Sequence, residues 1–148
     1  MGSEKARPRI GRIKSLTTAY VEHVAFVLAK EWMTFNEPIP DFHTRFPGKL
    51  EACVDQPFQT FEGKDLYPGL IKKGAILFYL LIKNHPFQNG NKRLAITCLF
   101  SFLGLNGKWL RVKPERLYSF TIYITTSVAE ENDEVINLIE DFIEKFII

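Results

Sequence analysis

The stretch Asn84-His85-Pro86-Phe87-Gln88-Asn89-Gly90-Asn91-Lys92-Arg93 is a polar segment between two apolar runs. Residues 70–82 before it and residues 94–105 after it both place apolar side chains at helical spacing. Pro86 disfavours helical backbone at the residue before it, and Asn89-Gly90 favours a turn. We therefore expect two buried helices, one ending near Asn84 and the other beginning near Asn91, with a rigid polar loop between them.

The start of the second helix is a candidate anion site. The first turn of a helix carries N–H groups without an intrahelical partner and the positive end of the helix dipole. Lys92 and Arg93 add two cations there, and a phosphate would satisfy the N–H groups and both side chains together. His85, close by in sequence, is then a candidate general base for transfer to an alcohol. The alternative is that His85 merely ends a helix and that the cations are solvated surface.

Residues 85–93 resemble the signature of the Fic/Doc family, and Lys92 places the chain nearer the Doc branch than the Fic branch. Further segments are similar to Doc-type members: Phe46–Glu51, Pro57–Phe61, Leu66–Pro68, and Phe102-Leu103 before Asn106-Gly107. The resemblance covers about residues 40–110. It implies an all-α helical bundle with a small β-hairpin flap beside the active-site loop.

The resemblance also implies roles for individual residues. His85 would be the catalytic base, and Gly90, Asn91, Lys92 and Arg93 would bind the nucleotide phosphates. The flap would contain Phe58, Gln59, Thr60 and Phe61, and it would pair with the backbone of a target protein. The co-substrate would be ATP, with Mg²⁺. The partners would be a protein target, such as one similar to elongation factor Tu, and an antitoxin protein.

Two departures from the Fic pattern affect the expected chemistry. Asn89 stands where the family usually has the acid that holds magnesium, and an amide oxygen binds this hard cation more weakly than a carboxylate does. Ile96 stands where Fic-type transferases usually have a second arginine. Together with Lys92, this favours Doc-type phosphoryl transfer to a Ser or Thr hydroxyl. Fic-type AMP transfer, or a catalytically weak nucleotide- or partner-binding protein, remains an alternative.

Composition and charge restrict the class of protein. The chain has 148 residues, 46% hydrophobic residues and a net charge of +2, which fits one globular domain and gives no reason to expect direct nucleic-acid binding. Cys53 and Cys98 follow no metal-ligand or disulfide pattern, and no apolar run is long enough to span a bilayer. We therefore expect a soluble, cytoplasmic protein with reduced thiols and no membrane partner.

The remaining chain completes the expected domain. Residues 1–14 are predicted to be a basic arm, with an expression-tag remnant at its start, and residues 15–148 to be a single Fic/Doc domain. Other helices are expected at about 18–33, 48–54, 115–129 and 133–147. Ser127, Glu131 and Asn132 match a short pattern by which some family members carry an inhibitory helix. Whether they do so here is left open.

Overall fold

The protein is described by a computed structural model that covers residues 12–32, 39 and 41–148. Most of the predicted N-terminal arm therefore lies outside the described residues. The described chain is mainly helical, and it contains one small antiparallel hairpin, β1 (Thr60–Phe61) paired with β2 (Lys64–Asp65). The predicted all-α fold with a small hairpin is confirmed.

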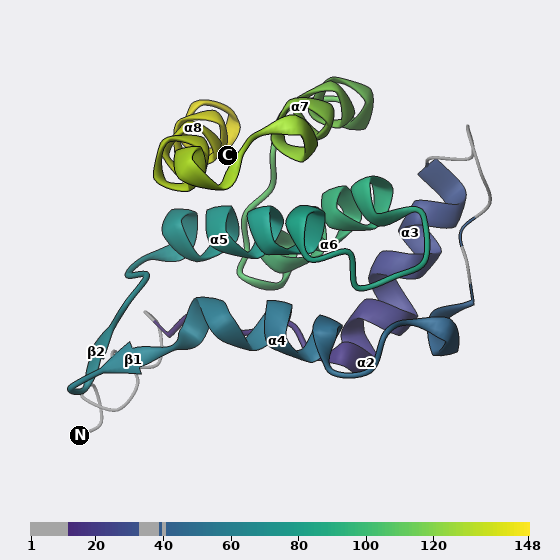
Figure 1. Cartoon of the computed structure of the whole chain (residues 1–148), viewed down its shortest axis with the longest axis horizontal. Helices are drawn as coiled ribbons and strands as arrows, with labels where there is room; N and C mark the ends of the chain where they lie inside the picture. The colour runs from purple at the N-terminus through teal and green to yellow at the C-terminus, as the bar shows by residue number, and fades with distance from the viewer. Residues whose placement is uncertain (1–11, 33–38, 40) are drawn as a thin grey trace.

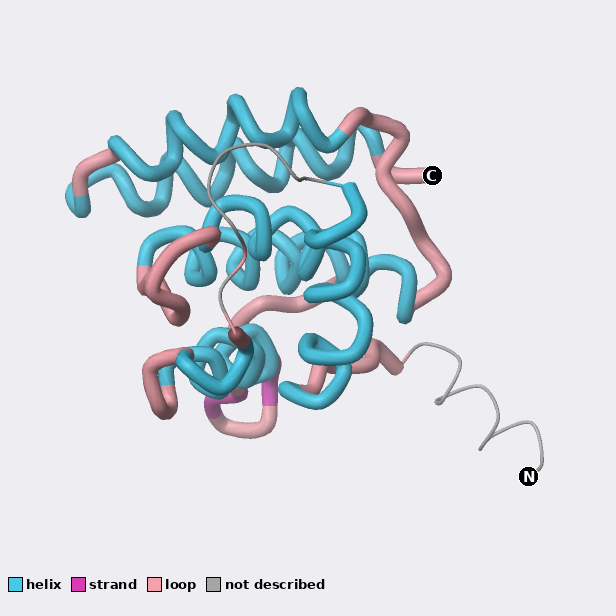
Figure 2. Tube along the Cα trace, turned by 90° about the vertical axis from the view of Figure 1, so that its right-hand side faces the viewer, coloured by secondary structure: helices cyan, strands magenta, loops and turns pink. Residues whose placement is uncertain are grey.

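The helices form three layers (Figures 1 and 2). The middle layer contains α5 (Leu70–Lys83) and α6 (Asn91–Leu105), which pack against each other. One outer layer contains α7 (Pro114–Thr126) and α8 (Asn132–Phe146), and α4 (Lys49–Asp55) lies in the other. The elements α2 (Thr18–Tyr20), η1 (Val21–Ala25) and α3 (Phe26–Trp32) cover the remaining part of α6. Short 3₁₀ turns lie at Phe42–Thr44 (η2), Gln56–Phe58 (η3) and Ala129–Glu131 (η4).

The two middle helices are buried on all sides over most of their length. Every residue from Lys73 to Ile82 in α5 and from Arg93 to Leu103 in α6 is buried. A helix that is apolar all round is typical of the interior of a protein. Both ends of α6 and the C-terminal end of α5 lie where the sequence predicts them, because Pro86, Gly90 and Asn106-Gly107 interrupt the helical pattern.

Gly74 lies where α6 and α8 pack against α5. A Cβ atom at Gly74 would lie 3.4 Å from Leu99 Cδ1 of α6 and 3.7 Å from Ile143 Cδ1 of α8. These are ordinary van der Waals distances, so the close approach is real but leaves room for a methyl group.

Several details differ from the predictions. Thr17 caps the N-terminal helix by accepting a bond from the Tyr20 N–H. The middle of that helix, however, is π-helical over Val21–Ala25. The helix α5 begins at Leu70, after Gly69. The linker after α6 also pairs with the C-terminal segment, through a bridge between Leu110 and Ile147.

The two cysteines are free and buried, as predicted. Burial raises the pKa of the Cys53 thiol to about 11 and that of Cys98 to about 12. Both thiols are therefore protonated near neutral pH and are poor nucleophiles. Among the described residues, no helix is both long enough and apolar enough to cross a membrane.

Candidate active site

The loop between α5 and α6 starts with an unusual backbone conformation. Asn84 ends α5, with its N–H bonded to Leu80 O at 2.9 Å. The next residue, His85, has φ +48° and an exposed side chain. Pro86 therefore excludes right-handed helix at His85 as predicted, but the residue adopts left-handed instead of extended backbone. A non-glycine residue in this region costs about 1–3 kcal/mol and is maintained by its surroundings.

Three sets of contacts hold the loop in place. The Asn91 side chain accepts a bond from the Phe87 N–H at 2.9 Å and donates one to Phe87 O at 2.8 Å. The buried Phe87 ring packs against Phe26 and Phe42, with centroids 5.2 and 6.2 Å away. The Phe46 N–H donates to Pro86 O at 2.9 Å, which ties the segment before α4 to the loop. The loop is thus fixed by local and distant parts of the chain.

The helix after the loop begins at Gly90, which has φ +73° and provides no side-chain cap. The first intrahelical bond runs from the Leu94 N–H to Gly90 O at 2.9 Å. The N–H groups of the first turn therefore have no partner inside the helix. The structure thus contains the uncapped helix start on which the predicted phosphate site depends.

The predicted phosphate ligands differ in exposure. Lys92 is half-buried, whereas Arg93 is only 2% exposed. Asn91 uses its amide to hold Phe87, so its predicted contribution to phosphate binding would come from the backbone. The phosphate-binding roles of these residues stay predictions.

Asn89 is exposed on the loop, so its amide oxygen is accessible to a metal ion carried by phosphates. Within the described ranges, no group of three or more His, Cys, Asp or Glu side chains could hold a metal ion. Mg²⁺ usually keeps several waters and binds through substrate phosphates with one or two protein ligands. An exposed amide fits such a minor contact, and the predicted weak role of Asn89 stays a prediction.

The hairpin is not beside this loop. It comes just before α5, whereas the loop follows α5, and a helix of 14 residues is about 21 Å long. Figure 1 shows β1 and β2 at one end of the molecule and the loop between α5 and α6 at the other. The predicted position of the flap is wrong because a helix separates the two segments along the chain.

The predicted docking residues of the hairpin are mostly exposed. Gln59 and Thr60 are exposed, and Phe61 is 66% exposed. Phe58 is half-buried and packs edge-on against Phe102, with centroids 6.2 Å apart. A target that pairs with the hairpin could place its hydroxyl at His85 only by extending along α5. Docking at the hairpin stays a prediction.

The pattern around Ser127 lies at the corner between α7 and α8. Lys83 Nζ donates to Ser127 O at 2.8 Å, and the Tyr79 hydroxyl donates to Asn132 Oδ1. Both Ser127 and Asn132 thus hold this corner to α5, and Glu131 is exposed. An inhibitory role for this pattern stays open.

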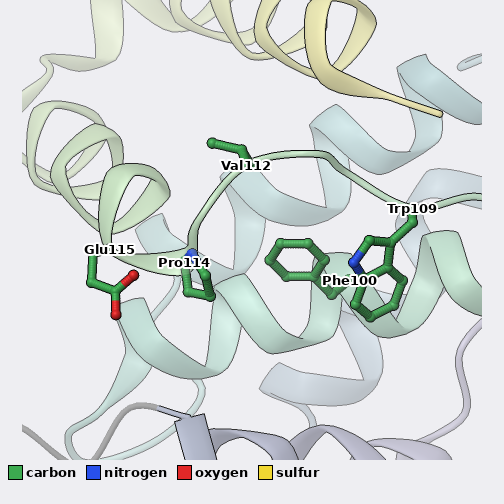
Figure 3. A pocket seen from close by; sticks show the side chains of 5 residues that line it. All are labelled: Phe100, Trp109, Val112, Pro114 and Glu115. Carbon is green, nitrogen blue, oxygen red and sulfur yellow. The ribbon is translucent and has the colours of Figure 1, made fainter.

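A pocket of about 340 Å³ lies away from the loop, between α6 and the linker that leads to α7 (Figure 3). Phe100, Trp109, Val112, Pro114 and Glu115 line it. Figure 3 shows Glu115 on the opposite side of the view from the two aromatic rings, with Pro114 between them. The pocket contains none of the predicted site residues.

Sequence reasoning did not identify Phe46 as a neighbour of the loop. The segment 46–51 contributes to the resemblance, but no local signal shows that the Phe46 N–H bonds to Pro86, forty residues along the chain. Such a contact depends on how α4 packs against α5, which is a property of the tertiary structure.

The comparisons with known proteins agree with the fold and the loop. The sequence pattern of the Fic/DOC family matches residues 15–103. Toxin Doc of Mycolicibacterium smegmatis (strain ATCC 700084 / mc(2)155) is 43% identical over 60 residues, which is 40% of this chain and 46% of that protein. The match thus covers about half the length of this relative. No solved structure gives a significant match. Because the family pattern covers more than half of the chain, this protein belongs to the Fic/DOC family.

Proposed function

We propose that this protein is a Doc-like toxin of a toxin–antitoxin system, and that it transfers the γ-phosphoryl group of ATP to a Ser or Thr hydroxyl of a target protein. The observation that carries the proposal is the rigid loop that holds exposed His85 near an uncapped helix N-terminus. The 43% identity to part of Toxin Doc supports the same class of function.

His85 and the start of α6 would have separate tasks in the reaction. The neutral imidazole of His85 would accept the proton of the target hydroxyl as its oxygen attacks the γ-phosphorus. The first-turn N–H groups of α6, with Lys92 and Arg93, would bind the phosphates and stabilise the charge of the departing diphosphate. Bound Mg²⁺ would neutralise further phosphate charge, with Asn89 as a minor ligand.

Two residues favour phosphoryl transfer over AMP transfer. Lys92 places a long cation where the Fic branch has glycine. The position of the second Fic arginine holds Ile96, an apolar side chain that is fully buried. In AMP transfer, the same histidine would activate the hydroxyl for attack on the α-phosphorus, and pyrophosphate would be released. In the other alternative, the loop only binds an anion and transfers neither group.

The partners in this proposal are proteins. The target is a protein hydroxyl, such as that of a translation factor similar to elongation factor Tu, and an antitoxin would inhibit the enzyme in trans. The exposed hairpin residues are candidates for docking the target, at a distance from the loop.

ATP labelled at the α or the γ position distinguishes the reactions. The protein is incubated with a lysate of its host and each labelled ATP, and modified proteins are identified by mass spectrometry. We expect label from the γ position only. Label from the α position on a target would replace the kinase proposal with AMP transfer. If neither position labels a target, the alternative of a catalytically weak binding protein would be favoured.

A further inference from the structure

Phe46 has an exposed side chain, and its backbone is bonded to the loop. Among the phenylalanines of the described residues, Phe46 and Phe61 are the ones that the structure leaves exposed, at 41% and 66%. Phe61 belongs to the hairpin, whereas the Phe46 N–H bonds to Pro86 O, next to His85. Single exposed apolar side chains are common on protein surfaces, but an exposed aromatic ring on a segment bonded to the candidate site is a candidate stacking surface for a base.

The segment that carries Phe46 does not need its ring to stay in place. Phe42 packs against Phe87 of the loop, and the Arg45 guanidinium lies 4.3 Å above the Phe42 ring. Arg45 also pairs with Glu51 at 3.1 Å. These contacts, together with the Phe46 backbone bond, fix the segment. None of these contacts uses the Phe46 ring, which stays 41% exposed.

Lys49 adds a cation to this surface. Its Nζ lies 5.1 Å from the centroid of the Phe46 ring, and its side chain is exposed. Glu51, the nearest acid along α4, is already paired with Arg45, so it does not neutralise Lys49. An aromatic ring with an ammonium group over one face suits a nucleotide, because a base can stack on the other face while the cation meets a phosphate.

We propose that Phe46 stacks on the base of the nucleotide and that Lys49 contacts its phosphates. This inference rests on the proposed function, since it places the nucleotide phosphates at the start of α6. Purine rings offer a larger stacking face than pyrimidine rings, so the site accepts purine nucleoside triphosphates more tightly than pyrimidine ones.

Calorimetry with two ligands tests the stacking. The ligands are ATP and inorganic tripolyphosphate, which has the phosphates but no base. For Phe46→Ala we expect about a 5- to 100-fold weaker affinity for ATP, the range that the loss of one base–aromatic stack implies. The affinity for tripolyphosphate should not change, because the backbone bond to Pro86 remains. Phe61→Ala is the matched control, since it removes the other exposed phenylalanine at the opposite end of α5, and it should leave both affinities unchanged.

Phe46→Trp provides an independent spectroscopic test. It keeps an aromatic face, so ATP should still bind and should quench the new tryptophan fluorescence, whereas tripolyphosphate should not. Unchanged ATP affinity in Phe46→Ala, or equal weakening of ATP and tripolyphosphate, would overturn the stacking proposal while leaving the proposed function intact. Wild-type protein that binds neither ligand would overturn the proposed function and this inference together.

Discussion

The two ends of α5 are held by similar contacts but carry different chemistry. At the hairpin end, residues 56–69, Lys73 Nζ donates to Asp65 at 3.0 Å and to Tyr67 O, and lies 5.3 Å from the Phe58 ring. At the loop end, residues 84–91, the Asn91 side chain bonds to the backbone of Phe87. In both places one polar side chain secures a short segment against the buried core.

Backbone strain separates the two ends. Among the described residues, Glu62 and His85 are the non-glycine residues with positive φ. Glu62 and Gly63, with φ +52° and +78°, form the two-residue turn of the hairpin, and the type I′ turn that is common in such hairpins requires positive φ at both positions. His85 also has positive φ, but it lies in the loop between α5 and α6 and not in a hairpin turn. The strain at the loop end is therefore not explained by a hairpin turn, which supports the proposal that this loop is the functional site.

Of the substitutions considered, replacing His85 should have the largest effect on the rate of transfer. In His85→Ala we expect transfer to fall by about 10²–10⁴-fold, because the base that accepts the hydroxyl proton is lost. ATP affinity should stay close to that of the wild type, since the imidazole acts on the acceptor and not on the phosphates. Transfer rates and calorimetry measure the two quantities. Wild-type transfer by His85→Ala would remove the histidine from the mechanism.

Lys73→Met tests the hairpin end. Lys73 is 2% exposed, and the substitution keeps an apolar stem but removes the charged bonds to Asp65 and Tyr67. We expect the free energy of unfolding to fall by about 2–3 kcal/mol, measured by urea denaturation, with unchanged ATP affinity. A similar loss in the free energy of ATP binding would show that the two ends of α5 are coupled. The two ends would then not have separate roles.

Asn91→Ala is the corresponding test at the loop end. It removes both bonds between the side chain and the Phe87 backbone, so we expect a loss of about 1–2 kcal/mol in stability. Unlike Lys73→Met, it should also lower transfer activity, because the loop that positions His85 loosens. A variant with lower stability but wild-type activity would show that the loop does not need this anchor.

The sequence predicted the loop well because its determinants are local. Pro86, Asn89-Gly90 and Asn106-Gly107 mark the ends of α5 and α6 through their own backbone preferences. The position of the hairpin was predicted wrongly and the Phe46–Pro86 bond was not predicted, because both depend on which segments meet in the folded chain. The π-helical segment Val21–Ala25 was missed because hydrophobic spacing does not distinguish it from an α-helix over so few residues.

Gly74→Ala should have a small effect on stability. Unlike Lys73→Met and Asn91→Ala, it should raise the free energy of unfolding. A methyl group at this position meets Leu99 and Ile143 at ordinary contact distances, and alanine favours helix over glycine by up to about 1 kcal/mol. We therefore expect a gain of up to about 1 kcal/mol in stability by urea denaturation, without a change in ATP affinity. A clear loss of stability would show that α5 and its neighbours tolerate no added volume there.

The central claim is that the nucleotide binds at the loop end of α5, and amide chemical shifts measured by nuclear magnetic resonance during titration with ATP test it most directly. We predict the largest shifts at Gly90, Asn91 and Lys92, smaller shifts at Phe46 and Lys49, and none at the hairpin residues Thr60 and Phe61. Shifts concentrated at the hairpin, with the loop amides unchanged, would contradict the claim.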